Sequence, residues 1–174
     1  MALVVETGTG DPAAESYVSV AGADTYHSDR ANTAWAALGT SAKEAALRKA
    51  AEYMANAYRE RWSGYRKTVT QALDWPRYMV PFKDAPGSYT NVRNYYDDSS
   101  VPVLVARACA ELALRASAGD LTPDLSPNVV KETVGPISVE YDPGSPEFVR
   151  FRQVDLMLEP LFAIGGGGLR VVRA

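Results

Sequence analysis

The sequence of 174 residues has one histidine, His27, and one cysteine, Cys109. A single cysteine cannot form a disulfide within the chain, and it gives no sign of an oxidising compartment. A zinc site needs about four Cys or His ligands, which these residue types do not supply. No nucleophile-elbow pattern is present, and a helical histidine near Asp24 is commonplace in proteins. We therefore expect no catalytic residue, no metal, no cofactor and no enzymatic activity.

The chain also has no apolar run approaching the roughly 18 residues of a membrane span. Its first residues, Met1 to Glu6, lack the basic n-region and the long apolar core of a signal peptide. The formal net charge is −3, so the chain as a whole does not attract nucleic acid. We expect one domain that is made in the cytoplasm and has no contact with a membrane.

Helical signals cover most of the chain. Ser19 is a candidate N-cap, and Ser41 to Glu44 form a capping-box pattern before an alanine-rich apolar stripe. Pro102 fits a first helical turn, and Gly119 fits a C′ position. The last helix is expected to begin at Ser145 and to bury Phe148, Phe151, Val154, Leu158 and Leu161. The expected helical segments are 19–30, a turn around 35, 41–64, a turn over 70–73, 102–119 and 145–161.

Three other segments depart from helical periodicity. Residues 129–141 alternate in polarity around Gly135-Pro136, which predicts a β-hairpin. Residues 74–99 carry prolines and many aromatic residues, which predicts an ordered arm that contacts a neighbour. Gly165 to Gly168 predict a flexible tether before a C-terminal strand. The predicted fold is mainly α: a small helical bundle with a β-hairpin, a long aromatic loop and an extended C-terminal tail. Its parts are an N-terminal arm (1–18), a helical domain (19–162) and the tail (163–174).

Two of these segments are candidate interaction sites. An isolated hairpin is marginally stable in water, so it must pack on helices or pair with another chain. Its candidate subunit-interface residues are Val134, Ile137, Val139 and Tyr141. The tail combines apolar residues with positive charge in an acidic protein, which favours strand addition to a partner or a neighbouring copy. Its candidate contact residues are Leu169, Arg170, Val171, Val172 and Arg173.

Basic and aromatic residues alternate from Tyr58 to Lys67. Arginine on phosphates, with aromatic rings stacked on bases, is how proteins hold single strands without reading their sequence. The competing interpretation is a helix C-terminus, where cations suit the helix dipole and aromatic rings are buried. The candidate nucleic-acid contacts are Arg59, Arg61, Trp62, Tyr65, Arg66 and Lys67.

Several strings along the chain carry a resemblance to a known family: residues 15–20 (ESYVSV), 32–38 (NTAWAAL), 71–77 (QALDWPR), 109–115 (CAELALR) and 132–139 (ETVGPISV). Together they resemble the head-tail connector (adaptor) proteins of tailed phages and prophages. Some members of that family carry the label DnaT-like single-stranded DNA-binding protein.

The resemblance implies a helical bundle that assembles as a dodecameric ring under the portal protein in the phage neck. Such a ring extends the DNA channel, lets DNA pass, and meets a tail-proximal neck or tail-terminator protein on its other face. It also implies that the protein is part of the virion and is made in the bacterial cytoplasm. The alternative function is a single-stranded DNA-binding, DnaT-like replication protein, which rests on the basic and aromatic residues between Tyr58 and Lys67.

Overall fold

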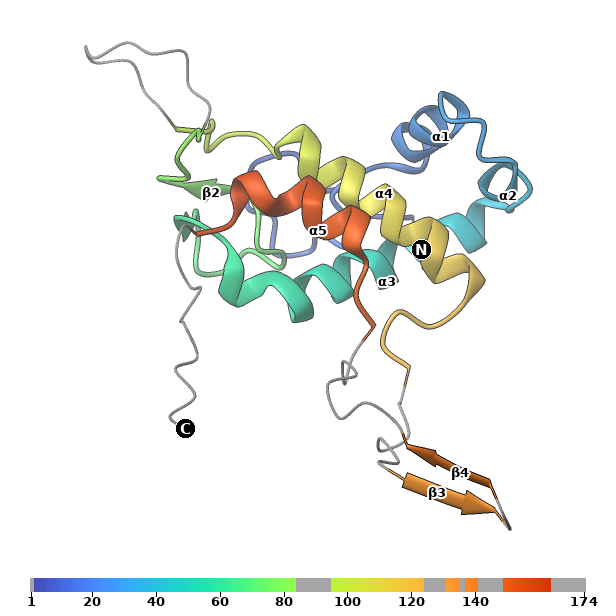
Figure 1. The fold of residues 1–174 in the computed structure, drawn as a ribbon. Coiled ribbons are helices and arrows are strands. Elements are labelled where there is room, and N and C mark those ends of the chain that lie inside the picture. The colour runs from blue at the N-terminus through green and yellow to red at the C-terminus, as the bar shows by residue number, and fades with distance from the viewer. Residues whose placement is uncertain (1, 84–94, 124–130, 135–136, 141–148, 164–174) are drawn as a thin grey trace, which may run out of the picture.

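The computed structural model describes residues 2–83, 95–123, 131–134, 137–140 and 149–163, and confirms a mainly helical fold (Figure 1). Its helices are α1 (Val20–Ser28), α2 (Thr33–Ala36), α3 (Thr40–Tyr58), α4 (Val103–Ala118) and α5 (Arg152–Leu158), with 3-10 turns η1 (Arg59–Arg61) and η2 (Glu159–Leu161). Its strands are β1 (Tyr65–Arg66), β2 (Arg77–Tyr78), β3 (Lys131–Val134) and β4 (Ile137–Glu140). None of the helices described here is long and apolar enough to cross a membrane.

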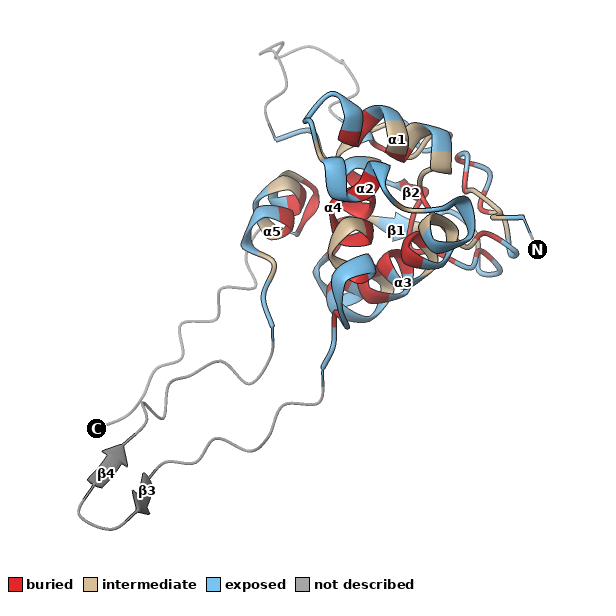
Figure 2. Ribbon diagram, turned by 90° about the vertical axis from the view of Figure 1, so that its right-hand side faces the viewer, coloured by how far each residue is buried: buried red, intermediate tan, exposed pale blue. Residues whose placement is uncertain are grey.

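The core lies between three helices. Helices α3 and α4 pack along each other, and α5 packs against α4 (Figures 1 and 2). Small side chains at the contact allow close approach of the helix axes, as the alanine-rich stripe predicts. The fully buried residues of this contact include Leu47, Ala50 and Met54 of α3, Val105, Ala108 and Leu112 of α4, and Val154 and Leu158 of α5.

The predicted helix starts are confirmed in part. The Ser19 hydroxyl caps α1 by accepting a hydrogen bond from the Gly22 amide at 3.1 Å. The capping box at Ser41 is wrong, because the N-cap of α3 is Gly39, two residues earlier, and no side chain caps this helix. Asn32 precedes α2, but its amide binds the ring of His27 instead of capping that helix.

The ends of α4 and α5 also differ from the prediction. Gly119 follows α4 with φ of −177°, an extended conformation, so no left-handed glycine ends this helix. Helix α5 begins at Arg152, later than the predicted Ser145, and residues 141–148 lie outside the described part of the chain. Its predicted stripe is buried at Val154, Leu158 and Leu161. The hydrophobic period therefore located the buried face of this helix more reliably than its start.

The segment between β1 and β2 is a tight loop. The predicted helical turn at 70–73 is wrong, because the backbone of this stretch bonds elsewhere: the Ala72 amide donates to the Asp11 carbonyl, and the Gln71 and Leu73 carbonyls accept from Arg66. The Gln71 side chain closes the loop. Its Oε1 accepts from the Thr68 amide at 2.8 Å, and its Nε2 donates to the carbonyls of Leu73 and Pro76 at 2.8 and 3.1 Å. The loop returns the chain to β2, which pairs antiparallel with β1.

The N-terminal segment packs on the helical domain. Val5 forms a bridge with Ser16, and the buried Glu6 carboxylate accepts four backbone N–H groups from residues 8–11. Gly8 has φ of +110°, and a Cβ there would lie 2.0 Å from the carbonyl oxygen of Ser99. Glycine at this position lets the N-terminal segment lie directly against the backbone of Ser99, shortly before α4.

The aromatic loop is closed at its base. The Tyr96 amide donates to the Val80 carbonyl at 2.9 Å, and Pro81 forms a bridge with Tyr95. The rings of Phe82 and Tyr96 stack with centroids 4.5 Å apart. Residues 84–94 lie outside the described part of the chain, so the predicted contact of this arm with a neighbour stays a prediction.

The predicted hairpin is present. Strands β3 and β4 pair antiparallel, with Val134 opposite Ile137 and Glu132 opposite Val139. This register leaves residues 135 and 136 as the connection, as the Gly-Pro pair predicts. The C-terminal residues 164–174, which include the predicted tether and tail strand, lie outside the described residues.

Candidate nucleic-acid interface

Most basic residues between Arg59 and Lys67 make contacts within the protein. The Arg66 guanidinium donates to the carbonyls of Gln71 and Leu73, and the Lys67 ammonium donates to the Gly8 carbonyl. Arg59 pairs with the fully buried Asp74 at 3.1 Å. Leaving a buried carboxylate without its ion-pair partner costs free energy, so we expect Arg59 to stay paired with Asp74. The interpretation as a structured helix end therefore accounts for much of this basic segment.

Arg61 and Lys67 are exposed cations of this segment, and a phosphate could take the place of the group that each one binds. Arg61 pairs with Asp155 at 3.0 Å, and the side chains of both residues are partly exposed, at 47% and 27%. Exposed ion pairs contribute about 0–1 kcal/mol, so a phosphate can replace the carboxylate at little cost. Lys67 is exposed and donates to a backbone carbonyl. These two side chains fit phosphate contacts better than Arg59 or Arg66.

Trp62 is not available for base stacking. Its side chain is only 5% exposed, and its ring packs against Tyr58, Trp75 and Phe162 with centroids 6.0, 5.7 and 5.1 Å away. The backbone next to it is fixed too, because the Ser63 amide donates to the Leu161 carbonyl. The prediction that Trp62 contacts nucleic acid is therefore wrong, since Phe162, after α5, covers its ring.

Tyr65 lies at the surface and has an aromatic partner that the sequence did not indicate. Tyr65 and Tyr78 stand opposite each other on β1 and β2, with ring centroids 5.5 Å apart and planes tilted by 33°. Their exposed fractions are 62% and 40%. We call these two residues the tyrosine pair. Each ring can offer an aromatic face to a base, which is the usual platform for single strands.

The backbone around the tyrosine pair is tightly constrained. Gly64 has φ of +65°, and a Cβ there would lie 2.3 Å from the Tyr78 carbonyl oxygen. Met79 has φ of 59°, although its large side chain disfavours that conformation, and it is 55% exposed. Backbone strain of this kind costs about 1–3 kcal/mol and is often found at functional sites. The two strands therefore present the tyrosine rings on a rigid support.

His27 is a core residue. It is fully buried, its Nε2 donates to the Ala110 carbonyl at 3.1 Å, and its Nδ1 accepts from the Asn32 amide at 2.9 Å. These partners select the neutral tautomer, and burial lowers the pKa of His27. Asp24 instead accepts from the Trp35 indole at 2.7 Å and pairs with Lys43. The two residues therefore do not form a catalytic pair.

Cys109 is also part of the core. It is fully buried in α4, and burial raises the pKa of its thiol to about 11. Its sulfur lies 3.7 Å from the Ser16 hydroxyl. Within the residues that the structure describes, no group of three or more His, Cys, Asp or Glu could hold a metal ion.

Among the described residues, sequence reasoning missed four buried charged side chains, and two of them, Glu6 and Arg77, bind several backbone groups. Glu6 accepts four amides, and Arg77 donates to the carbonyls of Ser63, Gly64 and Asp74 at 2.8, 2.7 and 3.3 Å. Burial lowers the pKa of the Arg77 guanidinium. The closely spaced Gly8 and Gly10 after Glu6 were the available signal, since such turns expose backbone N–H groups. Arg77 orders the loop that carries the tyrosine pair.

The other candidate interaction residues are placed only in part. Val134, Ile137 and Val139 lie in the paired strands β3 and β4. Tyr141 and the tail residues Leu169, Arg170, Val171, Val172 and Arg173 lie outside the described residues. The predicted roles of the hairpin and the tail stay predictions.

Comparison with known proteins identifies the family. The family model described as "Putative DnaT-like ssDNA binding protein" matches residues 1–174, the whole chain, and the protein belongs to this family. No curated protein and no solved structure matches the chain. The expected resemblance is therefore confirmed for the DnaT-like family label, while the connector assignment stays a prediction.

Proposed function

We propose that the protein binds single-stranded DNA and that this binding, not catalysis, is its role. The observation that carries the proposal is the tyrosine pair, Tyr65 and Tyr78, held at the surface on β1 and β2. Stacking of a base on an aromatic side chain contributes about 1–3 kcal/mol and tolerates any sequence. Membership of a family described as DnaT-like ssDNA binding supports the same function.

The charge of the protein limits the expected affinity. The chain carries a net charge of −3, and only Arg61 and Lys67 of the basic segment have partners that a phosphate can readily replace. Each neutralised phosphate on a single strand contributes about 0.7 to the slope of log affinity against log salt. We therefore expect a shallow salt dependence, with a slope of about −1 to −2, and a large contribution from stacking.

Fluorescence anisotropy with a labelled oligothymidylate tests the proposal. Tyr65→Ala should weaken binding about tenfold, since about 1.4 kcal/mol of stacking corresponds to that factor. Tyr65→Phe is the matched control, because it keeps the aromatic face and should bind as the wild type does. Equal affinities for the alanine and phenylalanine variants would exclude stacking at this position.

A second candidate function is the head-tail connector of a tailed phage, and the β3–β4 hairpin favours it. These strands form a sheet of two strands that pair only with each other among the described residues. A two-stranded hairpin needs packing or a partner to be stable, and a neighbouring copy in a ring would supply one. In this function the protein binds the portal protein and a tail-proximal neck or tail-terminator protein, forms a dodecamer in the virion, and lets DNA pass through its channel.

Electron microscopy of the protein mixed with its portal protein tests this second function. Closed rings on the portal, in a protein that does not bind labelled single strands, would favour the connector over the DNA-binding function. Single-strand binding without any ring on the portal would favour the opposite assignment.

A further inference from the structure

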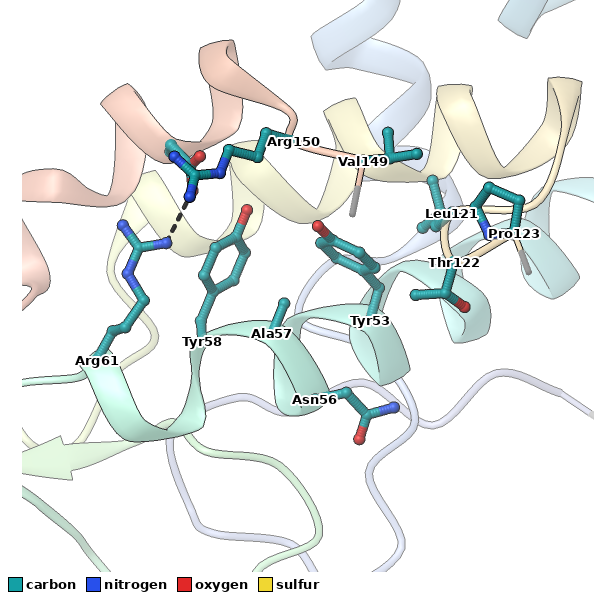
Figure 3. A pocket seen from close by; sticks show the side chains of 11 residues that line it. Tyr53, Asn56, Ala57, Tyr58, Arg61, Leu121, Thr122, Pro123, Val149 and Arg150 are labelled. Carbon is teal, nitrogen blue, oxygen red and sulfur yellow. Dashed lines mark hydrogen bonds and ion pairs between the residues drawn. The ribbon is translucent and has the colours of Figure 1, made fainter. Parts of the chain in front are cut away.

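A groove of about 650 Å³ lies between the C-terminal half of α3 and the start of α5 (Figure 3). Its walls include the rings of Tyr53 and Tyr58, which come from α3 and meet edge to face with centroids 5.9 Å apart. Arg61, Arg150 and Asp155 supply its charged groups. A volume of this size suits a small organic ligand or one unit of a polymer.

The hydroxyl of Tyr58 is a buried polar group at this groove. Tyr58 is only 2% exposed, and its oxygen makes no hydrogen bond within the part of the chain that the structure describes. Burial raises its pKa, and Asp155 and Tyr53 lie close enough to add to this effect. The hydroxyl is therefore neutral and can both donate and accept. A ligand in the groove that bonds to this hydroxyl would satisfy a buried polar group.

The charged groups in the groove favour an anionic ligand. Among the described residues, two guanidinium groups and one carboxylate line it, and the carboxylate, Asp155, pairs with Arg61 at 3.0 Å, so these three groups together carry one net positive charge. Figure 3 shows the Arg61 and Arg150 side chains reaching the same end of the groove, beside Tyr58. The Arg61 guanidinium also lies over the Tyr58 ring, with its carbon 5.2 Å from the ring centroid. Aromatic walls beside arginines match a planar base that is attached to a phosphate.

We propose that this groove holds one nucleotide of a bound single strand, with its phosphate between Arg61 and Arg150 and its base against Tyr53. The Tyr58 hydroxyl then donates to an oxygen of the nucleotide. This inference rests on the proposed function and adds a second contact surface to the tyrosine pair. Arg61 belongs to the same basic segment as Tyr65, so one strand can run from the groove toward β1.

Two variants test the groove. Tyr58→Phe removes only the hydroxyl, and it should weaken oligothymidylate binding about fivefold, corresponding to one hydrogen bond. The same variant should keep the wild-type melting temperature within a few degrees, because the hydroxyl makes no hydrogen bond of good geometry with the described residues. Arg150→Ala should weaken binding about fivefold and reduce the salt slope by about 0.7, the value for one phosphate. Arg152→Ala, an exposed position on α5 outside the groove, is the matched control.

The outcomes separate this inference from the proposed function. If the wild type binds the oligothymidylate and both groove variants bind as tightly as Arg152→Ala, the groove is not a nucleotide site, and the proposed function stands. If the wild type does not bind single strands at all, the proposed function fails and the groove proposal fails with it. Weakened binding by Tyr58→Phe without loss of thermal stability supports the groove.

Discussion

Replacing Glu6 with glutamine should destabilise the protein strongly. The Glu6 side chain is almost fully buried, and its Oε1 accepts the amides of Gly8, Thr9 and Gly10 at 2.8, 2.8 and 3.0 Å. Its Oε2 accepts the Asp11 amide at 2.8 Å. All four bonds go to a charged acceptor, which makes each of them stronger than a neutral bond.

The magnitude follows from the geometry of the four bonds. A glutamine can place its carbonyl oxygen at the Oε1 position and keep three bonds, now without the charge, at a cost of about 0.5–1 kcal/mol each. Its amide nitrogen then faces the Asp11 N–H, so one bond is lost and two donors oppose each other, at about 1–2 kcal/mol. We expect a total loss of about 3 kcal/mol, a large share of the 5–15 kcal/mol typical of a domain.

Guanidinium denaturation followed by circular dichroism measures this effect. The control is Glu52→Gln, which removes the same charge from an exposed position on α3 and should change stability by less than about 0.5 kcal/mol. The melting temperature of Glu6→Gln should fall by about 6–12 °C. A loss below 1 kcal/mol would show that the four amides do not depend on the carboxylate.

Three further predictions concern the core and the hairpin. Burial lowers the pKa of His27, so the unfolded chain binds this proton more readily than the folded protein does. The free energy of unfolding should therefore fall as the pH drops through about 6.5, the pKa of an unfolded histidine. Denaturation measured between pH 8 and pH 5 should show a smaller fall for His27→Asn than for the wild type. Cys109 should react with a thiol reagent only as fast as the protein unfolds, because it is buried and its pKa is raised to about 11; rapid labelling of the native protein would contradict this. In the connector function, Val139→Asp should block ring formation on the portal while the melting temperature of the monomer is unchanged, and normal rings would remove the hairpin from the interface.

The sequence predicted best what depends on local patterns. The Ser19 cap, the buried face of α3 and the pairing of β3 with β4 follow from spacing and from turn chemistry within a few residues. The exact start of α3 did not follow, because Gly39 and Ser41 are both acceptable at a helix N-terminus. The structure places the boundary at Gly39.

The site was predicted less well, because its residues are arranged by tertiary contacts. Trp62 and Tyr65 look equivalent in an alternating basic and aromatic segment, but Phe162 and Trp75 cover the first and leave the second exposed. Tyr78 lies beside Tyr65 because the loop between β1 and β2, which the Gln71 side chain closes, brings the two strands together. The spacing of apolar residues in a sequence does not reveal hydrogen bonds between side chains and distant backbone groups.

Photocross-linking of an oligothymidylate that carries 5-iodouracil, followed by mass spectrometry, tests whether the protein holds single-stranded DNA on its exposed and groove tyrosines. We expect cross-links at Tyr65 or Tyr78 and at Tyr53 or Tyr58. An excess of unlabelled single strand should suppress them, and an equal excess of duplex should not. The absence of specific cross-links at saturating oligonucleotide, or cross-links confined to other residues, would contradict this expectation.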